Sequence, residues 1–253
     1  MGSEENQEIS PEELIKKEAE AIFAKTYHCP ICDEDFKHKT VKSNRVRRLG
    51  ADIDLRPRMK DVDILKYQML FCPHCGYAAM PAYFDHISGT QRRLITANIS
   101  ETFEPKEESE SPVISYDEAI GAYLQALKCA EVKLGKLSEK AYYNLIVHWL
   151  MEEKLLEIKN EDTKAKLATQ SELFYRRAYD GFTKAISEEY FPMAGMDEIT
   201  VDYLVGYMAY HFKDFEIASK QVSTVLVNQM APRRIKDLAL ELKEKIIEEL
   251  KKK

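Results

Sequence analysis

Two short stretches, Cys29-Pro30-Ile31-Cys32 and Cys72-Pro73-His74-Cys75-Gly76-Tyr77, decide how the first third of this chain folds. A Cys-x2-Cys spacing turns both sulfur atoms toward one point, and two such pairs supply four soft ligands, a set that suits tetrahedral zinc. Each pair carries a proline that fixes φ directly after its first cysteine, and Gly76 is free to adopt the positive φ that closes such a turn. The sequence therefore predicts one structural zinc ion, bound by Cys29, Cys32, Cys72 and Cys75.

Two other chemistries use similar cysteine pairs. Iron in rubredoxin-like sites is held by Cys-Pro-x-Cys-Gly turns, but Asp33 stands where the first pair needs its glycine, and the connection between the pairs is long and basic. Thioredoxin-like motifs begin a helix within a βαβ unit, and no such unit surrounds either pair. Zinc is preferred over both alternatives. Because four thiolates close the coordination shell, His28 and His74 are expected to lie beside the ligands without binding the metal.

The rest of the chain predicts a mainly α fold, in which a small β zinc-ribbon-like module precedes an α-helical, tetratricopeptide-like domain. An acidic, proline-bounded stretch marks the boundary between them. The helical half is expected to have a core of its own. The predicted parts are a disordered tail with a helix (1–25), a zinc-ribbon-like module with a basic insertion (26–100), an acidic linker (101–114) and a helical repeat-like domain (115–253).

Local patterns place the elements within these parts. Ser10, Pro11 and Glu13 predict a capped helix that runs to about Lys25. β-branched and aromatic residues predict short strands over 36–42 and 66–71. Apolar residues at helical spacing predict further helices over about 90–99, from 115, and over 138–158, 163–189, 201–212, 214–228 and 233–251.

A small–large–small pattern recurs in the helical half. It begins at Ala119, Ala178 and Ala218 with the spacing i, i+4, i+7, and Gly206 precedes the last copy. The pattern resembles the tetratricopeptide repeat, although the copies lie farther apart than its period of about 34 residues. Plain antiparallel helix packing needs the same small residues and stays as the alternative.

The net charge of −6 hides a basic segment between Lys37 and Lys60, with nine lysine and arginine residues against two acids. One interpretation is structural, because cations stabilise the formal charge of −2 on a four-thiolate zinc site, and Asp52, Asp54 and Arg56 are placed to form an internal ion-pair cluster. The other is a surface that contacts the phosphates of nucleic acid or another polyanion. Its candidate residues are Arg45, Arg47, Arg48, Arg56 and Arg58.

Several classes of function find no support in the sequence. It contains no glycine-rich phosphate loop, no Ser-His-Asp arrangement and no His-Glu-x-x-His motif, so no enzymatic activity is expected. No stretch has the length or apolar character of a membrane span, and the acidic N-terminus is unlike a signal peptide. Together with reduced cysteines, these features predict a cytoplasmic protein. Cys129 lies in an apolar helical pattern and is expected in the core.

The two cysteine pairs, with Asp52-Ile53-Asp54 and Tyr67 between them, resemble a bacterial family of uncharacterised proteins, domain of unknown function 2225. The resemblance covers roughly residues 25–230 and implies the same zinc ligands and a helical region, but no activity. The leading hypothesis is a noncatalytic zinc-binding scaffold whose helical domain binds a peptide or protein. The alternative is a nucleic-acid-associated regulator that uses segment 37–60.

Overall fold

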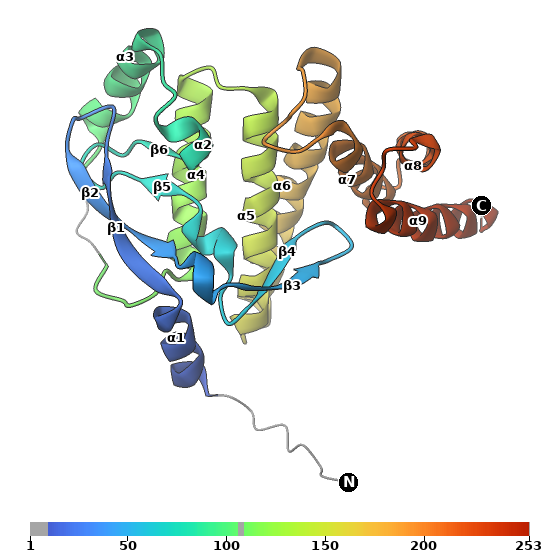
Figure 1. Cartoon of the computed structure of the whole chain (residues 1–253), viewed down its shortest axis with the longest axis horizontal. Helices are drawn as coiled ribbons and strands as arrows, with labels where there is room; N and C mark the ends of the chain where they lie inside the picture. The colour runs from blue at the N-terminus through green and yellow to red at the C-terminus, as the bar shows by residue number, and fades with distance from the viewer. Residues whose placement is uncertain (1–9, 106–108, 253) are drawn as a thin grey trace.

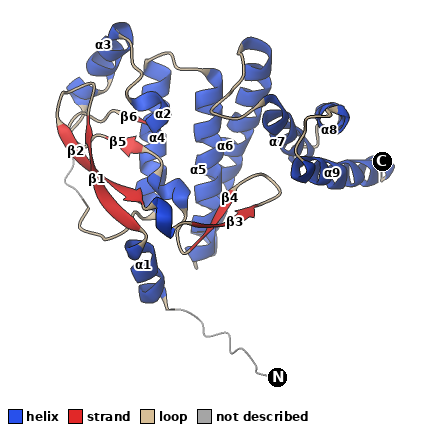
Figure 2. Ribbon diagram, viewed as in Figure 1, coloured by secondary structure: helices blue, strands red, loops and turns tan. Residues whose placement is uncertain are grey.

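The computed structural model describes residues 10–105 and 109–252. The protein is mainly α, as the sequence predicts. Three two-stranded hairpins lie along helices α4 (Tyr116–Val132) and α5 (Leu137–Glu157), and the later helices extend away from them (Figure 1, Figure 2). The predicted disorder of residues 1–9 falls outside the described residues.

Helix α1 (Pro11–Glu20) begins with the predicted capping box, in which Ser10 and Glu13 each bond the other's backbone. The prediction that this helix runs to about Lys25 is wrong. Ile22 instead starts strand β1 (Ile22–His28), which pairs antiparallel with β2 (Asp35–Val41) over its whole length. Long-range pairing of β-branched and aromatic residues therefore overrides the local helical pattern.

Two further hairpins follow. Strands β3 (Arg47–Ala51) and β4 (Pro57–Lys60) belong to the basic insertion, and their register shifts between Arg48 and Gly50. Strands β5 (Leu70–Phe71) and β6 (Ala78–Ala79) flank the second cysteine pair. The predicted strand 66–71 is only partly a strand, because its beginning lies in a 3-10 turn, η2 (Ile64–Tyr67), that Asp63 caps.

The helical predictions agree with the structure to within a few residues at each end. The remaining helices are α2 (Pro81–Phe84), α3 (Gly89–Asn98), α6 (Glu161–Glu188), α7 (Glu198–His211), α8 (Phe215–Val227) and α9 (Arg233–Lys251), with short 3-10 turns at Ser43–Arg45 (η1) and Ser100–Thr102 (η3). None of the helices in the described ranges combines the length and apolar character needed to cross a membrane.

Small residues bring the helices close together. A Cβ atom added at Gly181 of α6 would lie 2.9 Å from Cβ of Ala141 on α5, and one added at Gly206 of α7 would lie 3.2 Å from Cβ of Gln221 on α8. All nine residues of the recurring small–large–small pattern are buried. These contacts explain the pattern by close helix packing, and the tetratricopeptide classification stays a prediction.

One hydrophobic core crosses the predicted boundary at residues 101–114. Leu65, Met69 and Ala78 belong to the same buried cluster as Tyr123 and Tyr143 of the helices. The hydroxyl of Tyr123 donates to the carbonyl of Leu65 at 3.2 Å. The expectation that the helical half has a core of its own is therefore wrong, because the metal module supplies part of that core.

Candidate metal centre

The two cysteine pairs form the same turn twice. In the first, the amide of Cys29 donates to Glu34 at 2.9 Å, and its carbonyl accepts from Asp33 at 3.0 Å. In the second, the amide of Cys72 donates to Tyr77 at 2.8 Å, and its carbonyl accepts from Gly76 at 3.0 Å. The backbone therefore makes two equivalent knuckles, one between β1 and β2 and the other between β5 and β6.

Both knuckles close with a residue at positive φ. Gly76 has φ 73°, as predicted for a glycine, and Asp33 has φ 64° at the equivalent position of the first knuckle. Aspartate tolerates this left-handed conformation better than most residues. The absence of a glycine after the first pair therefore leaves the turn unchanged.

The four cysteines meet at one point. Their sulfur atoms all lie within 4.8 Å of one another. The Sγ atoms of Cys29 and Cys75 are 3.6 Å apart, and those of Cys32 and Cys72 are 3.7 Å apart. Zinc–sulfur bonds of about 2.3 Å in a tetrahedron separate sulfurs by about 3.8 Å. The residues thus fit one tetrahedral metal ion, consistent with zinc.

The surroundings of the sulfurs favour a structural role. Cys29, Cys72 and Cys75 are buried, and Cys32 is half-buried. Four protein thiolates leave no open coordination position for a substrate.

The two neighbouring histidines stay outside the sulfur cluster. His28 lies with its Nδ1 2.9 Å from Asp35 and its Nε2 3.0 Å from Asp33, and these carboxylates raise the pKa of His28. Nε2 of His74 lies 3.2 Å from the carbonyl of Asp35 and so joins the second knuckle to β2. Both side chains connect backbone segments around the site.

Cys129 lies next to the second knuckle from α4. It is buried, and its Sγ donates to the carbonyl of Gly76 at 3.6 Å. The predicted core position is confirmed. Gln125, one turn earlier on α4, donates to the same carbonyl at 2.8 Å. The helical half therefore holds the second knuckle directly.

The basic insertion folds against the helices through Arg56. This side chain is buried and donates to the carbonyl of Trp149 at 2.8 Å, to Glu153 at 2.7 Å and to Asp63 at 2.7 Å. The prediction that Arg56 contacts a polyanion is wrong, since its guanidinium is enclosed between two carboxylates.

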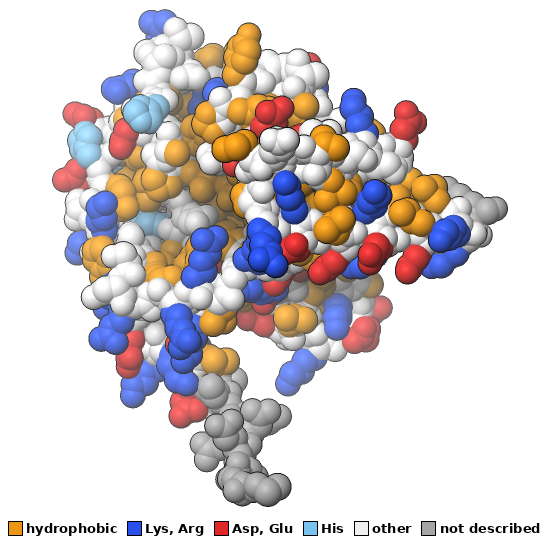
Figure 3. All heavy atoms as spheres, turned by 45° about the vertical axis from the view of Figure 1, so that its right-hand side comes forward, with side chains coloured by type: hydrophobic (Ala, Val, Ile, Leu, Met, Phe, Trp, Pro, Cys, Tyr) orange, Lys and Arg blue, Asp and Glu red, His pale blue; other side chains and the backbone are white. Residues whose placement is uncertain are grey.

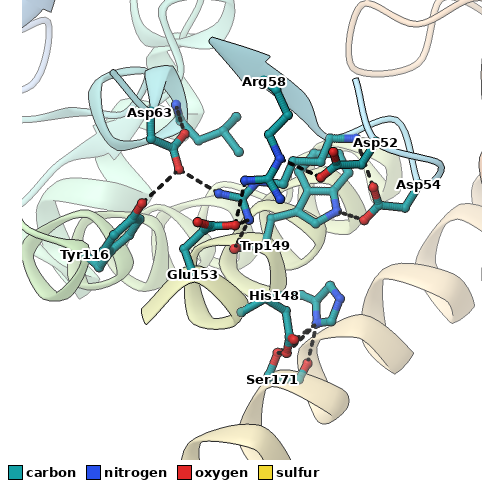
Figure 4. Close-up of polar contacts among 12 residues, drawn as sticks. Asp52, Asp54, Arg58, Asp63, Tyr116, His148, Trp149, Glu153 and Ser171 are labelled. Atoms are coloured by element: carbon teal, nitrogen blue, oxygen red, sulfur yellow. Dashed lines mark hydrogen bonds and ion pairs between the residues drawn. The ribbon is translucent and has the colours of Figure 1, made fainter. Parts of the chain in front are cut away.

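The predicted internal ion-pair cluster is confirmed in part: Asp52 and Arg56 take part in ion pairs, but with other partners than predicted, and Asp54 forms hydrogen bonds only. Arg58 donates to Asp52 and to Glu153, both at 2.6 Å, and Asp54 accepts from the indole of Trp149 at 2.5 Å (Figure 4). Asp54 also caps the amide of Arg56 at 3.2 Å. Glu153 and Trp149 lie about a hundred residues farther along the chain, so no local signal identifies them.

The other predicted arginines stay at the surface. Arg45, Arg47 and Arg48 are exposed and form no ion pair within the described parts of the chain. Arg58 keeps 40% of its side chain exposed but is already paired. The structure thus leaves three of the five candidate arginines available to an outside anion.

A groove with a volume of about 430 Å³ opens between the metal module and the helices. Lys37 and Lys39 of β2 line one wall, Met69 and Phe71 line the floor, and α4 forms the other wall. Figure 3 shows hydrophobic side chains around a recess on this face. Its size and mainly apolar lining match those of ligand sites in proteins. Neither half of the chain makes the groove alone.

A family model covers nearly all of this architecture. Residues 22–246 match the family described as Uncharacterized protein conserved in bacteria (DUF2225). The chain belongs to this family. The resemblance inferred from the cysteine pairs and the Asp-x-Asp element is thereby confirmed, and the match includes the groove and helices α4 to α8. No curated protein and no solved structure matches the chain. The DUF2225 description names no activity, so a function has to be argued from the site.

Proposed function

We propose that this protein is a noncatalytic zinc-binding scaffold that binds a peptide or a segment of another protein. The groove between β2 and α4 carries the proposal. Zinc would hold the β1–β2 wall against the β5–β6 knuckle, and the shared core holds that knuckle against α4. A binding site made by two parts that a metal joins is rigid before its partner arrives, which lowers the entropic cost of binding.

The chemistry of the buried polar groups supports a noncatalytic role. Nδ1 of His148 lies 2.8 Å from the hydroxyl of Ser171, a pairing that resembles an activated nucleophile (Figure 4). However, Ser171 is 1% exposed, and its hydroxyl donates to Glu152 at 2.6 Å. A nucleophile needs access to its substrate, so this pair is a structural contact between α5 and α6.

Affinity capture from a bacterial lysate tests the scaffold, with the full zinc-loaded chain as bait. Gly121 faces open space on the groove side of α4, so Gly121→Leu fills the groove and replaces a helix-weakening glycine. Gly89→Leu on α3 is the matched control, because that glycine also faces open space. We expect specific proteins to be captured by the wild type and by Gly89→Leu and to be lost with Gly121→Leu. Equal capture by all three baits would contradict the proposal.

A second candidate function rests on the three exposed arginines of the insertion. Arg45, Arg47 and Arg48, with Lys60 opposite Arg47 in the hairpin, gather positive charge that no ion pair within residues 10–105 and 109–252 neutralises. Such a surface suits phosphate contacts. Replacing the three arginines by alanine should weaken binding to a labelled DNA duplex. The slope of log affinity against log salt concentration should decrease by the equivalent of up to about three phosphate contacts. No binding by the wild type at low salt would exclude this candidate.

A further inference from the structure

We propose that the groove takes an extended peptide strand with alternating acidic and apolar residues, which pairs with the outer edge of β2. This inference rests on the proposed function and specifies the partner of the same groove. It is carried by three features of the described residues: an open strand edge, an apolar floor and two lysines that form no ion pair.

The outer edge of β2 faces the groove. In an antiparallel ladder, alternate residues direct their amide and carbonyl groups toward the partner strand or away from it. The bonds Cys29 to Glu34 and Lys42 to Ala21 fix this alternation, so Asp35, Lys37 and Lys39 direct theirs outward. The carbonyl of Asp35 accordingly meets His74 of the second knuckle.

The next two outward positions are open. Within residues 10–105 and 109–252, no strand pairs with β2 on this side, and the backbone groups of Lys37 and Lys39 have no partner. Both residues line the groove. An unpaired strand edge is a template for a further strand, and proteins use such edges to bind extended peptides.

The floor of the groove suits apolar side chains. Met69 is 2% exposed at its base, and Phe71 and Ala122 line it from β5 and α4. Gly121 leaves a gap in the helical wall, since nothing lies within 4 Å of the place where its Cβ would be. Side chains of an added strand that point inward would therefore enter a preformed apolar recess.

The groove contains two lysines that form no ion pair with the described residues. Of the two carboxylates in its lining, Asp117 pairs with Lys154, and Glu118 accepts from the amide and the hydroxyl of Ser115 at the N-cap of α4. Among the described residues, the ammonium group of Lys39 donates to the carbonyl of Ser109 at 3.4 Å and lies near Glu118, and neither Lys39 nor Lys37 forms an ion pair. Opposite charges on adjacent strands stabilise pairing, so acidic residues belong beside these two lysines.

The period of a strand combines these requirements. Successive side chains point to opposite faces, and Lys37 and Lys39 share a face, so acids at every second position meet the lysines. The residues between the acids point to the other face, toward the apolar recess. This pattern favours an acidic peptide segment over a nucleic acid, which has no backbone amides to pair with β2.

Titration calorimetry with the zinc-loaded full chain tests the inference. The probe is acetyl-Glu-Val-Glu-Val-Glu-amide, and the controls are the same peptide with lysine for glutamate and an N-methylated version that cannot pair as a strand. We expect the acidic probe to bind about tenfold tighter than the lysine peptide and N-methylation to abolish binding. Equal binding of all three peptides, or no binding of the acidic probe at millimolar concentration, would overturn the inference.

Variants make the result specific to the groove. Lys37→Glu together with Lys39→Glu should reverse the preference, so that the lysine peptide binds more tightly, an outcome that misfolding does not produce. Gly121→Leu should abolish binding and Gly89→Leu should leave it unchanged. If the Gly121-dependent capture of proteins persists but the acidic peptide shows no preference, the strand inference fails and the scaffold stands. Loss of the capture result itself would remove the scaffold proposal.

Discussion

The two knuckles have the same backbone but opposite surroundings. The first stands at the tip of a two-stranded hairpin, where His28 and Asp33 are exposed. The second is buried, with Tyr77 fully enclosed and Gly76 bonded from α4. The knuckle turn is therefore a local property of the Cys-x2-Cys sequence, whereas its stability comes from what each hairpin contacts.

The residues that close the two turns differ for a structural reason. Asp33 adopts a positive φ without being glycine, so the turn alone does not require one. At Gly76 a Cβ would lie 2.4 Å from Cδ2 of Phe103. The ring of Phe103, together with positive φ, makes glycine necessary there. Packing against Phe103, and not metal binding, therefore requires glycine at the end of the second knuckle.

The largest expected effect is that of removing the metal, which should destabilise the first knuckle more than the second. We expect one zinc ion per chain in the wild type and none in Cys32→Ser or Cys75→Ser, with a loss on the order of 10 kcal/mol of metal-binding free energy. The β1–β2 hairpin should lose its hydrogen-exchange protection, because an isolated two-stranded hairpin is marginally stable. The β5–β6 knuckle should keep part of its protection through the shared core.

Metal analysis and hydrogen exchange measure both outcomes. Zinc near zero in the wild type, or stoichiometric iron with thiolate-to-iron absorption, would contradict the metal assignment. Equal loss of protection in the two hairpins would show that the core does not support the second knuckle.

The next largest loss of stability is expected from a substitution in the hairpin inserted between the knuckles. Arg56→Ala leaves the largely buried Asp63 without its cation, while Glu153 keeps Arg58, and this should cost about 3 kcal/mol. Arg48→Ala, at an exposed position of the same hairpin, should cost less than about 0.5 kcal/mol. Chemical denaturation of the zinc-loaded chain compares them. Similar small losses would mean that the insertion contributes little to joining the two halves.

The closing residues give a more direct test. Gly76→Ala should destabilise the protein by about 2–4 kcal/mol through strained φ and overpacking, whereas Asp33→Ala should cost less, about 1–2 kcal/mol, because alanine there meets the positive φ without a neighbouring ring. Phe103→Ala should recover part of the Gly76→Ala loss in the double variant. No recovery would show that backbone strain alone, and not the ring of Phe103, requires glycine.

The smallest effect concerns pH and the two histidines of the first hairpin. Burial lowers the pKa of His38, which bonds the carbonyl of Tyr67 at 3.0 Å, whereas carboxylates raise that of His28. Between the lowered pKa of His38 and its unfolded value near 6.5, the unfolded state binds more protons. Stability should therefore fall as pH drops below 6.5, by at most about 1.4 kcal/mol per pH unit.

The difference between wild type and His38→Gln isolates this contribution, because acid-dependent loss of zinc affects both proteins equally. Denaturation midpoints measured from pH 8 to pH 5 should converge as pH falls. Parallel curves would show that His38 is not buried as a neutral imidazole.

The sequence predicts the parts of the structure that depend on local spacing. The knuckles follow from cysteines three positions apart, and the helices follow from the 3.6-residue period, so both are recovered closely. Strand β1 is missed because its pairing with β2 is long-range and its beginning continues the helical pattern of α1. Similarly, Asp52, Asp54 and Arg56 are recognisable in the sequence as a charged group. The partners of Arg56 and Asp54 on α5, however, are set by the fold alone.

The groove illustrates the same limit. Lys37 and Lys39 are visible in the sequence only as basic residues, and Gly121 only as a glycine within a helix. Their meeting depends on how β2 and α4 are placed by the shared core. A single sequence contains no local signal for such a site, whereas the metal ligands carry theirs in the Cys-x2-Cys spacing.

The inserted hairpin has a consequence for the synthesis of the protein. The hydroxyl of Tyr203 donates to the carbonyl of Ile53 at 2.7 Å across 150 residues, and Arg234 donates to Ala51 across 183 residues. At about 5–20 residues per second, the ribosome needs about 10–40 s to supply Arg234 after Ala51. Both cysteine pairs are complete long before then. During translation the metal ion would therefore be bound first, the insertion would next be anchored on α5 through Arg56, and its contacts with α7 and α9 would form last.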